Sequence, residues 1–244
     1  MTRICFNFAR NEKLKHISHL DMMRLFQRAL RRSGLPLAYS EGFSPHPRFN
    51  LAAPLPVGVT ADEEFGEVFF TGEITLEEFV AALKKQLPDG LQLKNAFILN
   101  NQAPPIPSIV SAALYRAHLE IANLRTNTDV EEYRSALARL IDKEEILAPR
   151  SSKKGKKKTY VNVRPYIFEA NLDEQGNANF LSLNLLLQTG SKGGVSPVFV
   201  LEQLEQELGD KQPQHLNWDL HRVKLYRDRN GSLEPLSEGM CING

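Results

Sequence analysis

The stretch SHLDMMRLFQRALRRSGLP, residues 18–36, predicts a helix whose two ends are marked by the residues themselves. Apolar side chains recur in it at the spacing of one helix face: Met22, Met23, Phe26, Ala29 and Leu30. Ser18 stands at the position of a cap, and Asp21 three residues later completes a capping-box pattern. Gly34 and Pro36 then end the helix. The stretch therefore predicts one amphipathic helix over 18–33.

The segments around this helix predict strands and a second helix. The predicted strands are Thr2–Phe8, Leu37–Ser40, Arg48–Pro54, Glu64–Thr71 and Leu91–Leu99, and the second helix is Thr75–Leu87. This order is the βαββαβ pattern of a ferredoxin-like domain, in which two helices pack on one face of an antiparallel sheet. The segment NNQAPPIPS that follows holds three prolines and predicts a linker.

The second half of the chain repeats the order of elements. Its predicted strands are Leu114–Ile121, Val161–Asn171, Phe180–Gln188 and His215–Tyr226, and its predicted helices are Asp129–Asp142 and Ser196 to about Leu208. We therefore expect an α+β chain with two tandem ferredoxin-like domains. The first spans 1–100, a Pro-rich linker spans 101–108, and the second spans 109–244 with a basic hairpin at 150–164.

Composition narrows the class of protein. The hydrophobic share of 42% in 244 residues suits a globular protein, and no apolar run approaches the roughly 20 residues of a membrane span. Cys5 and Cys241 stand far apart, without the spacing of a zinc site, an iron–sulfur site or a disulfide framework. We therefore expect no metal and no cofactor on this chain, no membrane association, and a reducing cytoplasmic location.

The net charge is only +1, but the basic residues are segregated along the chain. Between Asp21 and Glu41 there is no acidic residue and there are four arginines: Arg24, Arg28, Arg31 and Arg32. At about 100° per residue, the first three fall within about 60° of one another, opposite the apolar side chains. Because a guanidinium suits phosphate groups, this helix face is a candidate nucleic-acid surface. An ordinary solvated helix face is the alternative.

The loop EGFSPHPRFNLAAPLPVG, residues 41–58, is stiffened by its prolines. His46 lies between two of these prolines, and Arg48 follows. An imidazole in such a loop is expected to be exposed, so that it can stack on a base or transfer a proton. A rigid connector that feeds a strand is the alternative.

The segment PRSSKKGKKKTYVNVRP, residues 149–165, carries a cluster of lysines before an alternating strand. The lysines are Lys153, Lys154, Lys156, Lys157 and Lys158. A basic hairpin tip can bind a nucleic-acid backbone by releasing counterions. Tyr160, Arg164 and Tyr166 share strand parity and would point to one face of a regular strand, where Tyr160 and Arg164 are candidate contacts for bases and phosphates. A mobile solubilising loop is the alternative.

The segment TGSKGGVSP, residues 189–197, places three glycines and Lys192 before a helix. Helix N-termini bind anions, but the spacing is not that of a Walker A motif. A glycine-rich turn without a ligand is the alternative, and Lys192 is a candidate nucleic-acid contact.

The stretch HISHLD, residues 16–21, contains two histidines and a carboxylate. Ser18 and Asp21 fit a helix start better than an active site. A zinc site would need further ligands, and the sequence offers none in a suitable pattern. As candidates for general acid–base catalysis we keep His46, His19 and His16, without assigning any of them.

Residues 15–59 closely resemble an uncharacterised bacterial family of radical-SAM-linked proteins, encoded beside or fused to a radical SAM enzyme. The segments KKGKKKTYVNVRPYI and GSKGGVSPVFVLEQL resemble the family's later pattern, so the resemblance covers nearly the whole chain. It implies a partner enzyme with a [4Fe–4S] cluster, whose chemistry would occur on the partner. The expected architecture is also analogous to that of the RAMP ribonucleases that process CRISPR repeats, although fold does not determine function.

Three functions therefore remain open. The first is an RNA-binding accessory protein that presents RNA to a partner radical SAM enzyme, and nothing in the sequence specifies DNA. The second is a metal-independent, RAMP-like endoribonuclease that uses one of the three histidines. The third is a protein-only scaffold for the radical SAM partner. Whether the chain is an enzyme stays open at this point.

Overall fold

The computed structural model shows a mixed α+β fold with mostly antiparallel strand pairing. It describes residues 1–120, 130–150, 159–173, 179–209 and 217–236. The chain forms two compact units: unit 1 is Met1–Ala112 with His221–Gly244, and unit 2 is Ala113–Leu220. The last part of the chain therefore belongs with unit 1, whereas the sequence pattern places it in the second domain.

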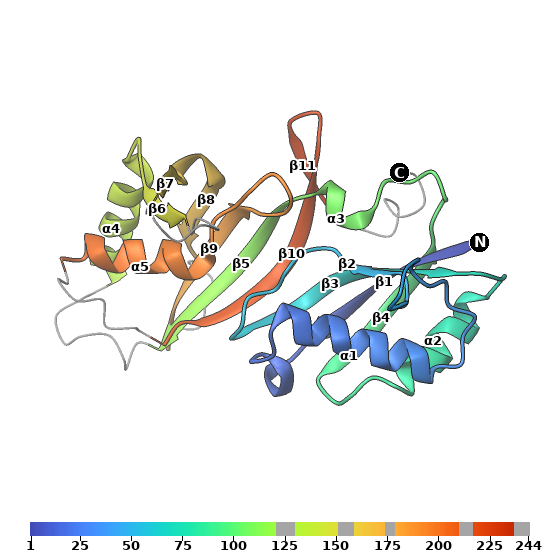
Figure 1. Cartoon of the computed structure of the whole chain (residues 1–244). Helices are drawn as coiled ribbons and strands as arrows, with labels where there is room; N and C mark the ends of the chain where they lie inside the picture. The colour runs from blue at the N-terminus through green and yellow to red at the C-terminus, as the bar shows by residue number, and fades with distance from the viewer. Residues whose placement is uncertain (121–129, 151–158, 174–178, 210–216, 237–244) are drawn as a thin grey trace. The chain divides into compact units, whose positions relative to one another are not determined.

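Unit 1 begins with alternating strands and helices (Figure 1). These are β1 (Thr2–Arg10), α1 (His19–Arg32), β2 (Phe49–Leu51), β3 (Val59–Phe70), α2 (Leu76–Lys84) and β4 (Leu91–Ile98), with a short 3-10 turn at Glu12–Leu14. Strand β1 lies between β3 and β4 and pairs antiparallel with both, and β2 pairs antiparallel with the other edge of β3. The predicted strand Leu37–Ser40 forms only isolated bridges, Leu37 with Phe70 and Tyr39 with Pro47.

Both helices of unit 1 pack on the same face of its sheet through phenylalanine rings. The ring of Phe6 on β1 lies 5.6 Å from that of Phe26 on α1 and 5.6 Å from that of Phe79 on α2. A Cβ atom at position 66 would lie 2.7 Å from the ring of Phe6, so this close approach requires Gly66. The three rings are fully buried, and removing one is expected to cost about 3–5 kcal/mol.

The predicted Pro-rich linker is held against unit 1. The Arg3 guanidinium donates to the carbonyl oxygens of Ala103 at 2.6 Å and Pro104 at 2.9 Å, and it forms a buried ion pair with Glu67. A short helix, α3 (Ile106–Ile109), follows within this segment. Unit 1 is completed by most of β10 (Asp219–Arg229), which lies next to β3, and by β11 (Ser232–Pro235), which pairs with β10.

Unit 2 combines strands, a separate ribbon and two helices. Its elements are most of β5 (Val110–Glu120), α4 (Val130–Asp142), β6 (Leu147–Arg150), β7 (Thr159–Asn162), β8 (Ile167–Leu172), β9 (Phe180–Gln188) and α5 (Pro197–Glu207). Strands β5, β9 and β8 are neighbours in that order, and β6 with β7 forms a two-stranded ribbon of its own. Helices α4 and α5 pack against each other.

The predicted strand Val161–Asn171 is correct only in part, because the structure divides it into the end of β7 and the strand β8. Strand β7 ends at Asn162, a 3-10 turn follows at Arg164–Tyr166, and β8 pairs with β9 instead of β6. Pro165 explains the break, since proline has no N–H to donate and its ring fixes φ. Tyr160, Arg164 and Tyr166 therefore do not share one regular strand face.

No helix in the described part of the chain is long and apolar enough to cross a membrane.

Candidate nucleic-acid interface

The arginines of α1 lie on its solvent side, because Met22, Phe26, Ala29 and Leu30 occupy the buried side. Two of the four are bound locally. Arg24 donates to the carboxylate of Asp21 at 3.0 Å, and Arg32 donates to the side-chain and backbone oxygens of Gln86 at 3.1 and 3.0 Å. The exposed side chains of Arg28 and Arg31 have no ion pair or hydrogen bond within the described residues. These two cations are the ones available to an anion.

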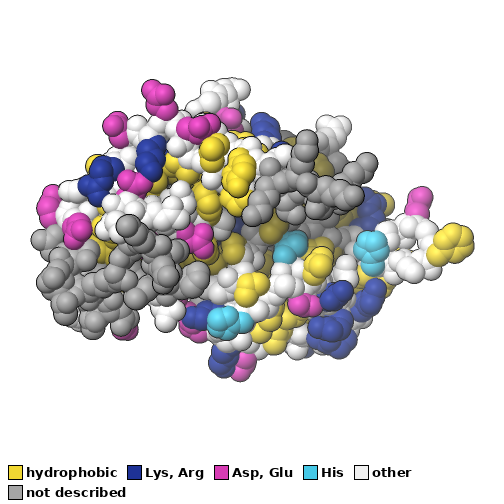
Figure 2. Space-filling model, turned by 60° about the vertical axis from the view of Figure 1, so that its left-hand side comes forward, with side chains coloured by type: hydrophobic (Ala, Val, Ile, Leu, Met, Phe, Trp, Pro, Cys, Tyr) yellow, Lys and Arg dark blue, Asp and Glu magenta, His cyan; other side chains and the backbone are white. Residues whose placement is uncertain are grey.

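The start of α1 is the predicted capped turn. Ser18 accepts a hydrogen bond from the Asp21 N–H at 3.2 Å and donates its hydroxyl to the Asp21 carboxylate at 2.7 Å. These bonds from Ser18, followed by the contact with Arg24, lower the pKa of the Asp21 carboxyl. A dark-blue patch of Lys and Arg side chains, with histidine rings nearby, is visible on one face in Figure 2.

His19 lies half-buried in the first turn of α1, whereas His16 is exposed. Burial lowers the pKa of the His19 imidazole, and the charge of Arg222 lowers this pKa further. Arg222 is fully buried and donates from Nε to the Glu64 carboxylate at 2.6 Å, with a second bond from Nη2 to the same carboxylate. The lowered pKa favours the neutral form of the His19 imidazole beside this buried ion pair.

Two buried arginines hold the stiff segment that leads into β3. Arg222 donates to the Pro54 carbonyl at 2.9 Å, and Arg10 donates to the carbonyls of Val59 at 3.0 Å and Pro56 at 2.8 Å. Burial lowers the pKa of Arg10 to about 10. Neither residue stands out in the sequence, since one arginine in an alternating strand looks like an exposed position. They act as supports for the backbone and are not free to bind an anion.

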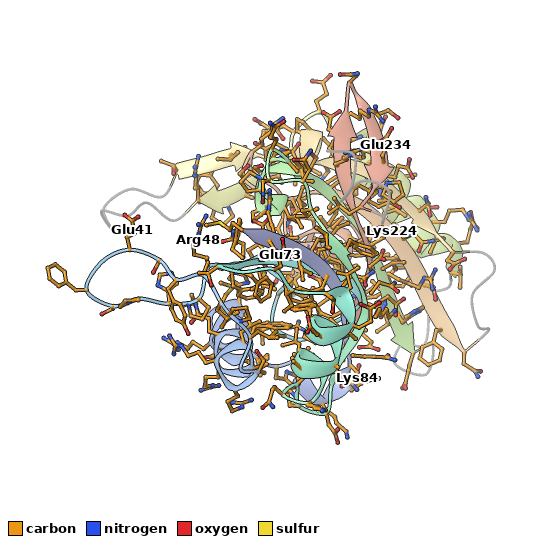
Figure 3. All side chains as sticks on the ribbon, turned by 90° about the vertical axis from the view of Figure 1, so that its right-hand side faces the viewer. Glu41, Arg48, Glu73, Lys84, Lys224 and Glu234 are labelled. Carbon is orange, nitrogen blue, oxygen red and sulfur yellow. The ribbon has the colours of Figure 1, made fainter. Side chains whose placement is uncertain are left out.

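The loop that precedes β2 projects from unit 1, with Glu41 near its tip and Arg48 at its base (Figure 3). His46 is exposed, and its Nδ1 lies 2.9 Å from the Ser40 hydroxyl oxygen. The Arg48 guanidinium stacks over the ring of Phe69 at 4.5 Å. At the tip, the side chain of Phe43 is fully exposed. No described hydrogen bond or ion pair connects His46 with His16 or His19.

Unit 2 contains a pocket of about 350 Å³ between its ribbon and its glycine-rich loop. Its lining residues come from β6, β7, the turn that follows them and the loop before α5: Ala148, Pro149, Arg150, Val161, Val163, Tyr166, Ser191, Lys192, Gly193 and Gly194. Two of them are cations and none is acidic. Arg150, Tyr166 and Lys192, which are far apart in the sequence, therefore line one basic pocket.

The glycines shape the wall of this pocket. Gly193 has a φ of +99°, and a Cβ atom at position 194 would lie 2.4 Å from the carbonyl oxygen of Gln188. The Gln188 side-chain amide donates to the carbonyls of Lys192 at 3.5 Å and Gly193 at 3.4 Å. The loop is thereby held with its carbonyls turned toward Gln188.

The remaining predicted contacts have different outcomes. Tyr160 on β7 is 56% exposed and stays a candidate. Arg164 donates from Nε to the Ile141 carbonyl at 2.8 Å and from Nη1 to the Ile167 carbonyl at 3.0 Å, so its guanidinium is bound to the backbone. The structure shows these backbone contacts of Arg164, and its predicted contact with a nucleic acid stays a prediction. The five lysines of 153–158 lie outside the described residues.

Within the described ranges, no group of three His, Cys, Asp or Glu side chains is placed to hold a metal ion.

Comparison with known proteins identifies the family. Residues 3–197 match the model of a family described as "Uncharacterized protein conserved in bacteria (DUF2344)", and the chain belongs to this family. Among solved structures, a chain of the "Crystal Structure of a Cbf5-Nop10-Gar1 Complex" is similar with a TM-score of 0.50 and 8% identity. The likeness covers 91% of this chain and 48% of that one, so this chain spans about half its length. At this identity the likeness concerns the fold alone. None of the curated proteins matches the chain.

Proposed function

We propose that this chain binds RNA and presents it to a partner radical SAM enzyme in the cytoplasm. The observation that carries the RNA-binding half is the pocket of unit 2, which brings Arg150 and Lys192 together without an acidic residue. In the sequence, the lysine-rich segment 151–158 directly follows Arg150, which lines this pocket. Clustered cations of this kind bind a phosphate backbone through counterion release. The proposed partner rests on the resemblance of residues 15–59 to radical-SAM-linked proteins.

The face of α1 supports the same proposal. Arg28 and Arg31 are exposed one turn apart on a rigid, capped helix, and their guanidinium groups have no partner within the described residues. A pair of fixed guanidinium groups suits phosphate oxygens better than a mixed-charge surface would. Base contacts would come from the exposed aromatic and imidazole rings of Tyr160 and His46.

We also propose that both units are ferredoxin-like, as in RAMP proteins. In unit 1 the element order is βαββαβ, and β4, β1, β3 and β2 are neighbours in that order. In unit 2 the strands β5, β9 and β8 are arranged as the first, third and second strands of such a domain would be, with the ribbon β6–β7 inserted after α4.

A second candidate function, a metal-independent endoribonuclease, is favoured by His19. An imidazole kept neutral near pH 7 can accept a proton from a ribose hydroxyl. Cleavage of RNA in the presence of EDTA, abolished by His19→Gln and retained by His16→Gln, would establish this activity. If the wild-type chain does not cleave RNA, RNA binding without cleavage remains as the candidate function.

The binding proposal is tested by the salt dependence of RNA affinity. Fluorescence anisotropy with a labelled single-stranded RNA is measured between about 50 and 200 mM salt. We expect alanine at both Arg28 and Arg31, or at all five lysines of 153–158, to weaken binding and to reduce the slope of log K against log salt by about 0.7 for each phosphate that is no longer neutralised. A control variant, Lys84→Ala with Lys85→Ala, removes two exposed charges at the end of α2 (Figure 3). Equal slopes in all variants would refute the assigned surfaces, and a protein partner that co-purifies without RNA would favour the scaffold function.

A further inference from the structure

We infer that the pocket of unit 2 binds a phosphate monoester, the group found at a phosphorylated end of an RNA strand. The inference rests on the proposed RNA binding and names the part of the RNA that this pocket takes. An internal phosphodiester would then be bound elsewhere, on surfaces such as the arginine face of α1.

The charge of the pocket fits a monoester better than a diester. Arg150 and Lys192 line it, their side chains have no ion pair within the described residues, and no acidic side chain belongs to the lining. A phosphate monoester carries a charge of about −1.5 to −2 near pH 7, whereas an internal phosphodiester carries one negative charge. The two cations therefore match the charge of a strand end.

The pocket also offers the hydrogen-bond donors that a monoester needs. The Tyr166 hydroxyl belongs to the lining and has no partner within the described residues. The backbone N–H groups of Ser191, Lys192 and Gly194 have no acceptor in the part of the chain that the structure describes. Within the described part of this loop, the Gly193 N–H donates to the Gly190 carbonyl at 3.3 Å and the Val195 N–H donates to the Gln188 carbonyl at 3.3 Å. A monoester presents three strong acceptor oxygens, and these donors and the two cations can satisfy them.

The size of the pocket sets a limit of one nucleotide. Its volume of about 350 Å³ is near the lower end of ligand pockets, roughly 300–1,000 Å³. The ribbon β6–β7 forms one wall and the loop 191–194 forms another, and the ring of Tyr166 lies within 3.9 Å of the Cβ position of Gly193. A terminal nucleotide can enter such a pocket. An internal nucleotide could enter only if the RNA strand passed both into and out of the pocket.

The experiment compares RNAs that differ only at their ends. Anisotropy measures the affinity of the full chain for one RNA sequence with a 5′-phosphate, a 3′-phosphate or two hydroxyl ends. We expect one phosphorylated end to bind about tenfold more tightly than the hydroxyl-ended RNA, because the hydroxyl end cannot form the charge-assisted bonds. Arg150→Ala with Lys192→Ala should abolish this difference, and Tyr166→Phe, which keeps the ring, should reduce it. Lys84→Ala with Lys85→Ala should preserve it, and circular dichroism checks that each variant is folded.

The outcomes separate this inference from the proposed function. If all three RNAs bind equally, or if the double variant keeps the preference, the monoester pocket is overturned while RNA binding stands. If no RNA binds, the proposed function is overturned. Calorimetry with a nucleoside 5′-monophosphate and with inorganic phosphate then decides whether the pocket binds a phosphate monoester. Binding of the monophosphate that the double variant loses supports a monoester site for a free nucleotide, and no binding overturns the site.

Discussion

Replacing Glu64 by glutamine is expected to destabilise unit 1 more than any single change at its surface. The Glu64 side chain is 5% exposed and that of Arg222 is not exposed at all, and both carboxylate oxygens accept from this one guanidinium. Glutamine keeps the shape but supplies one oxygen and no charge, so the buried guanidinium would lose the opposite charge of Glu64. Removing one partner of a buried ion pair costs about 3–5 kcal/mol, and we expect a decrease in stability in this range.

Urea unfolding followed by circular dichroism measures this decrease, with a separate free energy for each transition if the two units unfold separately. The matched control is Glu77→Gln on the exposed first turn of α2, which is expected to cost no more than about 1 kcal/mol. A double variant, Glu64→Leu with Arg222→Met, should recover part of the stability, because an apolar pair needs no compensating charge although the Pro54 carbonyl loses its donor. A decrease below about 1 kcal/mol for Glu64→Gln, or a double variant less stable than the single one, would refute the reasoning.

Three further changes test separate features. Because the pKa of His19 is lower in the folded chain than its usual 6.5, the stability that His19 contributes is complete above about pH 6.5 and is lost as pH falls through the folded pKa. The difference between the urea midpoints at pH 7.5 and pH 5 should therefore shrink in His19→Gln, and an unchanged difference would contradict the cause assigned to the shift. Thr75→Ala removes a capping box, in which the Glu78 N–H donates to the Thr75 hydroxyl oxygen at 3.2 Å, and should lower stability by about 1 kcal/mol in the same assay. Gly194→Ala forces the loop away from the Gln188 carbonyl. It should lower RNA affinity with little change in the unfolding midpoint. An unchanged affinity would show that the pocket does not take part in RNA binding.

Local patterns in the sequence predicted most of the elements. The strand Phe180–Gln188 was predicted with the bounds that the structure has, and α1 was predicted with its cap at Ser18, because alternation, helical spacing and capping act over a few neighbouring residues. Prediction failed where one residue overrides the pattern around it. Pro165 divides an otherwise alternating segment, and in the turn that results Arg164 donates to two backbone carbonyls.

The candidate interface was predictable in part for the same reason. Helical spacing alone puts Arg28 and Arg31 on one solvent-facing side of α1, since residues three or four apart share a helix face. Spacing could not show that Arg24 and Arg32 are bound by Asp21 and Gln86, because the second of these contacts joins residues 54 positions apart.

The sequence by itself determined most of the elements, the cap of α1 and the segregation of basic charge, because each of these depends on residues close together in the chain. Tertiary structure alone decided which charges are buried and which share a pocket. Arg222 meets Glu64 across 158 positions, and Lys192 lines the same pocket as Arg150 because the chain folds back between them. Two arginines in similar alternating strands are alike in sequence, and only the packing around each one turns it into a buried support or an exposed contact.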